Sequence, residues 1–346
     1  MITISRHLIL LRRLKVEMEK GITSDQRIWR IRPEWPFLLF LVFVVAAYLG
    51  LLLLMVGANV LTVSWSQASE ILKDADIQHS IVLTFVTCTA TAILSVLVSV
   101  PVGYLLSRYQ FRGRALVDTF LDIPILLPPL IVGLSLLILF NRITPSACCG
   151  MLAGGVLIAA IWGAARKGNG IVIRFLVGSA ISFGLLSFVF AGSQRSLEGI
   201  VSEVGFPMTF HPLGVVLAQF PVAAAFAVRT MRTTFDQISP RYEEVAMTLG
   251  CNRGQAFMRV VLPLAGKGIV AAGTMAWARA LGEFGPILIF AGATRGRTEV
   301  LATSVFLEIN IGNLPGAAAL SLLMILLAVS TLLIVRYLAG RGGGTV

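Results

Sequence analysis

Charged side chains are scarce in this sequence. Asp, Glu, Lys and Arg make up 13% of its 346 residues, whereas soluble domains carry roughly 25%. Hydrophobic residues reach 57% and the mean hydropathy is +0.88. Several runs of about 20 residues hold hardly a charge, which is long enough to cross a bilayer as a helix. The composition excludes a soluble enzyme, a fibrous protein and a disordered chain, and it predicts a polytopic helical membrane protein.

The residue patterns of several common sites are also absent. The phosphate-binding pattern Gly-x4-Gly-Lys-Ser/Thr does not occur, because the only Gly-Lys pair, Gly266-Lys267, is followed by Gly268. Three scattered histidines and four cysteines show no metal-ligand or Cys-x-x-Cys spacing. We therefore expect neither metal nor cofactor in this chain, and any ATP chemistry on another subunit. No long insertion that could capture a substrate outside the membrane is present either, which implies a separate binding protein.

The apolar runs predict eight membrane spans. They cover about residues 37–58, 80–106, 119–140, 147–164, 171–191, 211–230, 267–291 and 315–338. Lys and Arg number 22 in the N-terminal segment, the alternate loops and the C-terminal end, against five in the opposite loops. This asymmetry predicts that both termini lie in the cytoplasm. The net charge of +11 then reflects membrane orientation, and we expect no nucleic-acid partner.

The predicted transmembrane permease domain extends over residues 37–338, and it includes an extra hairpin and the cytoplasmic loop 239–263. Residues 1–36 form a basic cytoplasmic segment, whose start is either an amphipathic helix on the inner membrane surface, an untethered tail, or a stretch before an internal start codon. Residues 146–191 form a Gly/Ala-rich hairpin of two spans, and because two crossings cancel, we interpret it as a peripheral addition. Residues 339–346 form a cytoplasmic tail.

The longest predicted cytoplasmic loop, 239–263, has the sequence signals of a helix. Ser239 is suited to cap its N-terminus, and Glu243 and Glu244 favour the positive end of the helix dipole. Gly250 marks the C-terminal end, where a residue with φ > 0 is often needed.

A second short helix should follow in the same loop. Asn252 is suited to cap it, and Pro263 should end it. We expect its apolar residues, Phe257, Val260 and Val261, to be exposed. The predicted helix–turn–helix would then be a cytoplasmic knob shaped to dock in a groove on another protein.

Six positions of this loop keep a fixed spacing: Glu244-x-Ala246-x3-Gly250-x9-Val260-x-Leu262-Pro263. The pattern resembles the EAA loop of permease subunits in bacterial ATP-binding-cassette (ABC) importers. Val245 stands where that family usually has Ala, and Val260 where it often has Ile. The resemblance implies a coupling helix seated in a cleft of an ATPase subunit and oriented there by Glu244 and Gly250. The residues that it assigns to ATPase coupling are Glu243, Glu244, Ala246, Gly250, Leu262 and Pro263.

Further matches are similar to the molybdate, tungstate and sulfate permeases within this group. They are Trp277-Ala-Arg279-Ala-Leu-Gly282-Glu283-Phe284-Gly285, Asp122-Ile-Pro124 followed by Pro128-Pro129-x3-Gly133, and Arg297-x-Glu299-x-Leu301. The resemblance covers about residues 80–140 and 195–338. Such permeases typically have about six spans, so the 146–191 hairpin is a departure from the family pattern.

The resemblance implies an all-α polytopic bundle of the type I ABC importer permease kind, with about six core spans plus the hairpin. It implies a homodimer in the inner or cell membrane of a bacterium or archaeon. The implied partners are ABC ATPase subunits, which carry ATP and Mg, and a periplasmic or extracellular oxyanion-binding protein.

Arg279 and Glu283 are four residues apart and therefore share one helical face. They lie roughly 18–24 Å along a span entered from the cytoplasm. A charge at that depth costs at least about 2.5–3.5 kcal/mol, so the pair should face protein or water. Two readings stay open: an ion pair that fixes helix packing, or the lining of a translocation pathway that favours a divalent oxyanion.

The prolines and glycines of these patterns have structural interpretations. We assign Pro128, Pro129, Gly133, Gly282 and Gly285 to helix packing or gating.

Two carboxylates flank the start of the third span. We expect Asp118 to belong to a solvated loop with Arg112 and Arg114, and Asp122 to cap the helix before Pro124.

The sequence thus predicts a permease subunit that is not an enzyme by itself. It would couple closure of the ATPase subunits to alternating access for a tetrahedral oxyanion, with molybdate or tungstate favoured and sulfate as the third candidate. The alternatives are a secondary transporter or channel that uses Arg279 and Glu283 as its ion site, and a membrane scaffold without transport.

Overall fold

The computed structural model describes residues 35–63, 69, 71, 73–111, 113–165, 170–189, 196–203 and 205–341. The predicted basic segment up to residue 34, the hairpin turn 166–169 and the tail from residue 342 lie outside the described residues. The chain divides into two units, residues 1–58 and 59–346. The regular secondary structure of the described residues is helical.

The described part of the first unit is the greater part of α2 (Trp35–Thr62). This helix has 28 residues and no charged side chain, and its length of roughly 42 Å is more than a bilayer core requires. It corresponds to the first predicted span.

The second unit begins at the end of α2 and contains the other elements. They are, in chain order, α4 (Ala75–Arg108), α5 (Arg114–Leu126), α6 (Pro129–Arg142), α7 (Pro145–Ala165), α8 (Gly170–Val189), α9 (Leu197–Glu203), α10 (Pro212–Gln237), α11 (Arg241–Thr248), α12 (Arg253–Ala256), the π-helical turn η1 (Phe257–Val261), α13 (Leu262–Leu264), α14 (Gly266–Leu281), α15 (Gly285–Phe290), α16 (Leu301–Asn310) and α17 (Leu314–Arg341).

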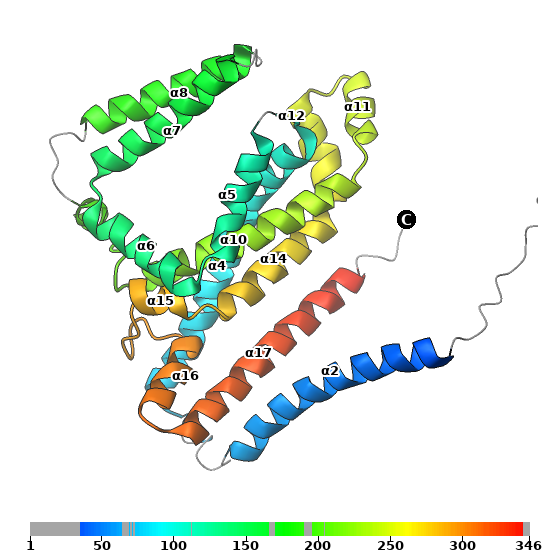
Figure 1. Ribbon diagram of the computed structural model, residues 1–346, viewed down its shortest axis with the longest axis vertical. Coiled ribbons are helices and arrows are strands. Elements are labelled where there is room, and N and C mark those ends of the chain that lie inside the picture. The colour runs from blue at the N-terminus through cyan, green and yellow to red at the C-terminus, as the bar shows by residue number, and fades with distance from the viewer. Residues whose placement is uncertain are drawn as a thin grey trace, which may run out of the picture. The chain divides into compact units, whose positions relative to one another are not determined.

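The core of this unit is the contact of α4 with α10 and α14, which lie side by side in Figure 1. The buried side of α4 is a row of small and hydroxyl side chains, among them Thr84, Thr87 and Thr91. The Thr84 and Thr87 hydroxyls donate to carbonyls one turn back in the same helix, at 2.6 and 2.8 Å, which satisfies them without water. Alanines of α10 face this row, including Ala223 and Ala227. Small residues on both sides allow the close backbone approach that membrane helices use.

The predicted span 119–140 is broken, so the prediction of one continuous helix there is wrong. The α5 and α6 helices meet at an angle of 108°. Pro128 and Pro129 cause the break, because neither has a backbone N–H and each forces the preceding residue out of the helical region. Leu127 and Pro128 are accordingly extended, with ψ of 139° and 134°.

The predicted span 267–291 is also interrupted. The α14 helix ends at Leu281, and the short α15 begins at Gly285. At the other end of α14, the segment Arg253–Leu264 meets it at 70°.

Among the described residues, four helices are long and apolar enough to cross a membrane: α2, α4, α10 and α17. The two bent pairs raise this number to six if each is one crossing, which matches the number of core spans expected from the resemblance.

The hairpin predicted at 146–191 is formed by α7 and α8, which pack against each other (Figure 1). Its open end is joined by the Ser187 hydroxyl, which donates to the Ser146 carbonyl at 2.8 Å. Just outside it, the Leu197 N–H donates to the Ile143 carbonyl at 3.2 Å. The chain thus returns to nearly the point from which it left, a geometry that supports the proposal of an inserted hairpin. Its crossing of the membrane stays a prediction.

Candidate coupling site and intramembrane ion pair

The predicted helix–turn–helix is present, and its turn is fixed by backbone hydrogen bonds. Gly250 follows α11 with φ of 92°. Its N–H donates to the Met247 carbonyl at 3.0 Å, and the Cys251 N–H donates to the Ala246 carbonyl at 3.1 Å. These two bonds are the Schellman arrangement that ends helices at a glycine. The prediction that Gly250 marks the end of this helix is therefore confirmed.

The start of the second helix is confirmed as well. The Asn252 side chain accepts from the Gln255 N–H at 2.8 Å, and the Gln255 side chain accepts from the Asn252 N–H at 3.0 Å, which is a capping box. The prediction for Ser239 is wrong. α11 begins at Arg241 without a side-chain cap. Ser239 contacts the start of the helix through its backbone carbonyl, which accepts from the Tyr242 N–H.

The exposed apolar surface of the knob lies mainly on α11. Leu249, just after that helix, is 81% exposed and Val245 is 58% exposed, with Tyr242 and Met258 also exposed. Ala246 is buried, so the helix turns one side inward and leaves the opposite side exposed.

Contrary to the prediction, none of the three apolar residues named for the second helix is exposed, and Val260 is half-buried. Val261 is fully buried and Phe257 packs against the same core cluster. The physical reason is that the helix does not stop before Pro263. It continues through the π-helical turn η1 into α13. Pro263 lies in the first turn of α13 itself, a position at which proline's missing N–H is tolerated. Leu262 is half-buried and Pro263 is exposed.

Glu243 and Glu244 are adjacent but have different surroundings. The Glu243 carboxylate accepts from Arg108 Nε at 2.6 Å and from the Tyr104 hydroxyl at 2.8 Å. Glu244 is exposed. Successive helix residues point about 100° apart, so one carboxylate faces α4 while the other faces solvent. The two glutamates predicted for ATPase coupling therefore point in different directions, and their role in coupling stays a prediction.

Arg279 and Glu283 are brought together at the end of α14. Arg279 Nη2 lies 2.9 Å from Glu283 Oε1, with Glu283 1% and Arg279 35% exposed. The Arg279 guanidinium also lies over the Phe226 ring of α10, 5.8 Å from its centroid. Arg279 lies 13 residues beyond the first residue of α14, roughly 20 Å along the helix. An ion pair at that depth therefore has one fully buried partner and one partner that remains accessible.

Gln219 of α10 is a residue of this region that sequence reasoning missed. It is 1% exposed, its side-chain oxygen accepts from the Thr91 hydroxyl at 2.9 Å, and its nitrogen donates to the Ala280 carbonyl at 3.2 Å. It thereby joins α4 and α10 to the end of α14 and satisfies a carbonyl where that helix breaks. The available signal was an amide side chain inside an apolar span.

The Pro-Pro-x3-Gly and Gly-Glu-Phe-Gly patterns meet where α6 contacts α15. A Cβ atom on Gly133 would lie 2.7 Å from Pro286 Cα, and one on Gly285 would lie 3.1 Å from the Leu130 nitrogen. These two glycines permit close backbone contact. Gly282 is exposed, and among the described residues the nearest atom to a Cβ built on it is 3.8 Å away, so the described part of the chain places no packing constraint on it.

The Arg-x-Glu-x-Leu pattern lies between α15 and α16. Glu299 is 1% exposed, and its burial raises the pKa of its carboxyl above the usual value, against the opposing effects of Ser304 and Arg295. The Leu301 N–H donates to the Thr84 hydroxyl oxygen at 2.9 Å. The pattern therefore anchors this loop to α4.

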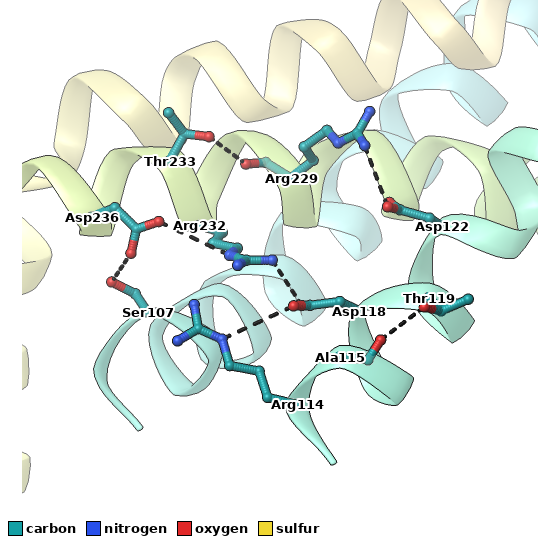
Figure 2. A network of polar contacts seen from close by, with 10 residues as sticks. All are labelled: Ser107, Arg114, Ala115, Asp118, Thr119, Asp122, Arg229, Arg232, Thr233 and Asp236. Atoms are coloured by element: carbon teal, nitrogen blue, oxygen red, sulfur yellow. Dashed lines mark hydrogen bonds and ion pairs between the residues drawn. The ribbon is translucent and has the colours of Figure 1, made fainter. Parts of the chain in front are cut away.

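Asp118 and Asp122 lie in α5 and pair with α10, which corrects both predictions for them. Figure 2 shows Arg232 reaching Asp118 and Arg229 reaching Asp122, with nitrogen–oxygen distances of 2.8 and 3.3 Å. Asp118 also lies 4.0 Å from Arg114, one turn earlier in the same helix, and Arg112 lies outside the described residues. Asp122 is not at a helix start, because α5 begins at residue 114.

The network continues from Arg232 to Asp236, whose carboxylate accepts from the Ser107 hydroxyl at 2.6 Å (Figure 2). α5 has no buried residue of its own. These ion pairs therefore supply the polar attachment of α5 to the core helix α10.

The fold is shared with solved ABC transporters. One chain of the crystal structure of a bacterial alginate ABC transporter in complex with an alginate pentasaccharide-bound periplasmic protein aligns with a TM-score of 0.63 at 15% identity. The alignment covers 92% of this chain and 99% of that chain. The architecture is that of a type I ABC importer permease, as predicted.

Residues 99–341 match the family described as binding-protein-dependent transport system inner membrane component. The chain belongs to this family, and it is a multi-pass membrane permease of the ABC importer class.

Two relatives illustrate the range of the family around this chain. The sulfate transport system permease protein CysT of Salmonella typhimurium is 26% identical over 271 residues, which cover 78% of this chain and 79% of the relative. The molybdate/tungstate transport system permease protein WtpB of Thermococcus kodakarensis is 26% identical over 308 residues, covering 87% of this chain and 97% of the relative. Both relatives are permease components of transport systems.

Proposed function

We propose that this chain is the permease subunit of an ATP-driven importer for a tetrahedral oxyanion, and that α11 is its contact with the ATPase subunit. The observation that carries the coupling proposal is the exposed apolar side of a short helix whose turn is fixed by Gly250. Two large apolar side chains, Val245 and Leu249, would cost free energy in water unless a partner covers them.

The proposal for the transported anion rests on Arg279. Its guanidinium remains 35% exposed while its partner Glu283 is buried, so it keeps donors available for an oxyanion. Helix α14 ends shortly after Arg279, and Gly282 lies in the break between α14 and α15. Non-helical backbone at membrane depth is tolerated where protein buries it or where it lines a water-filled cavity. The similarity to sulfate and molybdate/tungstate permeases supports an oxyanion substrate, with molybdate or tungstate favoured.

The mechanism requires partners. Two ATPase subunits would bind ATP and Mg, close, and move the coupling helices, which would switch access by rigid-body motion of the spans. A separate binding protein would deliver the anion on the outer side. We propose a homodimer with the pathway at the subunit interface, both termini in the cytoplasm, and the helices α7 and α8 as a peripheral addition. A secondary transporter that uses Arg279 and Glu283 remains the second candidate function, and it would need no ATPase.

Co-purification tests the coupling proposal. The wild-type permease, produced in its own host cell and extracted in mild detergent, should carry an ABC ATPase subunit with it. Leu249→Asp places a charge at the most exposed residue of this apolar surface and should weaken the association at least about tenfold, or 1.4 kcal/mol.

Ile311→Asp is the matched control, because Ile311 is 66% exposed and lies in the turn between α16 and α17. It should retain the ATPase in full. Wild-type protein that transports anions without ever retaining an ATPase would establish the secondary transporter instead.

A further inference from the structure

Arg108, the last residue of α4, joins three segments of the chain through one guanidinium group. Its Nε lies 2.6 Å from Glu243 Oε1 in α11. Its two terminal nitrogens donate to the carbonyls of Phe235 and Ile238, at 3.0 and 2.8 Å. The side chain is 10% exposed. The end of α4 is therefore bonded both to the C-terminal end of α10 and to the first turn of α11.

These contacts use the particular geometry of arginine. The last carbonyls of a helix have no partners within the helix, and a cation near them also interacts favourably with the helix dipole. A planar guanidinium has five donors in a fixed arrangement and can bind a carboxylate and two carbonyls at once, whereas an ammonium group is a compact point charge. Lysine at position 108 would not reproduce the three directions.

Tyr104, one turn earlier in α4, extends the connection to the second helix of the knob. Its hydroxyl donates to Glu243 Oε2 at 2.8 Å. Its ring lies 4.5 Å from the Phe257 ring of η1 and 5.6 Å from the Phe235 ring of α10, measured between centroids. We call the five residues Tyr104, Arg108, Phe235, Glu243 and Phe257 the Arg108 cluster. It contains residues from α4, α10, α11 and η1.

We infer that Arg108 is a positioning residue that transmits movement of α11 directly to the ends of α4 and α10. This inference rests on the proposed function of α11. Moving α11 alone would separate Arg108 from Glu243 and leave two largely buried charges unpaired, which is strongly unfavourable. Moving the cluster together preserves every contact. Movement of α11 would therefore reach the spans through the ends of α4 and α10, and also along the chain into α14.

The inference also divides the two neighbouring glutamates. Glu243 holds α11 to the permease, and Glu244 is left free to face the partner. Loss of Glu243 should therefore leave the ATPase bound and hydrolysing ATP, but with little transport for each ATP. Loss of Glu244 should weaken the binding of the ATPase. The ratio of anion transported to ATP hydrolysed separates these two outcomes.

The test uses the full importer in proteoliposomes, with ATP hydrolysis and uptake measured on the same samples. Labelled sulfate, molybdate and tungstate are supplied separately with the binding protein, and the one that the wild type accumulates serves as the probe. Arg108→Gln and Glu243→Gln should retain the ATPase and hydrolyse ATP within about twofold of wild type, yet transport at least tenfold less anion per ATP. Arg108→Lys should not restore the ratio. Arg114→Gln, which removes an arginine whose carboxylate partner is 4.0 Å away, is the matched control and should behave as wild type.

Tyr104→Phe keeps the ring contacts and removes one hydroxyl, so it tests the inference even if the charge variants do not fold. It should assemble fully and transport about two- to threefold less anion per ATP. Wild-type ratios in Glu243→Gln and Tyr104→Phe would overturn the inference. Those results would leave the coupling proposal intact, because that proposal fails only if the wild type does not bind an ATPase.

Discussion

Replacing Gly133 by alanine should destabilise the protein, although alanine is normally the better helix former. The added methyl group would lie 2.7 Å from Pro286 Cα and 2.9 Å from the Pro286 carbonyl oxygen. Both atoms belong to the backbone of α15 and cannot rotate away, so the helices must separate. Overpacking of this kind costs typically about 1–3 kcal/mol, which exceeds the gain of up to about 1 kcal/mol from helix propensity. The thermal unfolding midpoint in detergent should fall.

The same one-methyl change at two other glycines supplies the controls. Gly285→Ala meets the Leu130 nitrogen at 3.1 Å and should cost less than Gly133→Ala. Gly282→Ala meets nothing within 3.8 Å and should leave the unfolding midpoint of the isolated permease unchanged or slightly raised. An unchanged midpoint in Gly133→Ala would mean that α6 and α15 do not pack together in the folded protein.

Some features of this fold could be predicted from the sequence, and others could not. Two local signals were confirmed: Gly250 ends α11 and Asn252 caps α12, because a left-handed turn and a capping box involve residues close together in the chain. The local signal at Ser239 was wrong, since α11 begins at Arg241 without a side-chain cap. Composition also identified the membrane class. Hydropathy did not reveal the break at Pro128, because a hydrophobic average contains no information about the direction of the chain.

Long-range pairs were beyond sequence reasoning for a related reason. Glu243 pairs with a residue 135 positions away, and Asp122 pairs with one 107 positions away. No spacing rule applies at such separations. Arg279 and Glu283 could be paired in advance only because four residues along a helix bring two side chains to the same face.

Arg279→Gln should abolish anion uptake, but that result alone would not distinguish the pathway from packing. Glu283 is 1% exposed, and removing one partner of a buried ion pair typically costs about 3–5 kcal/mol because the other charge is left uncompensated. The single variant should therefore also lower the unfolding midpoint.

The double variant Arg279→Gln/Glu283→Gln separates the two readings, because it removes both charges and keeps two amides of similar size. If the pair only fixes helix packing, the double variant should recover both the unfolding midpoint and the uptake of labelled anion. If Arg279 lines the pathway, the midpoint should recover while uptake stays at least about tenfold below wild type, since an amide cannot replace the guanidinium in binding a dianion. We expect the second result, because the guanidinium remains accessible beside Phe226, whereas an ion pair that serves packing alone has no need of an exposed cation.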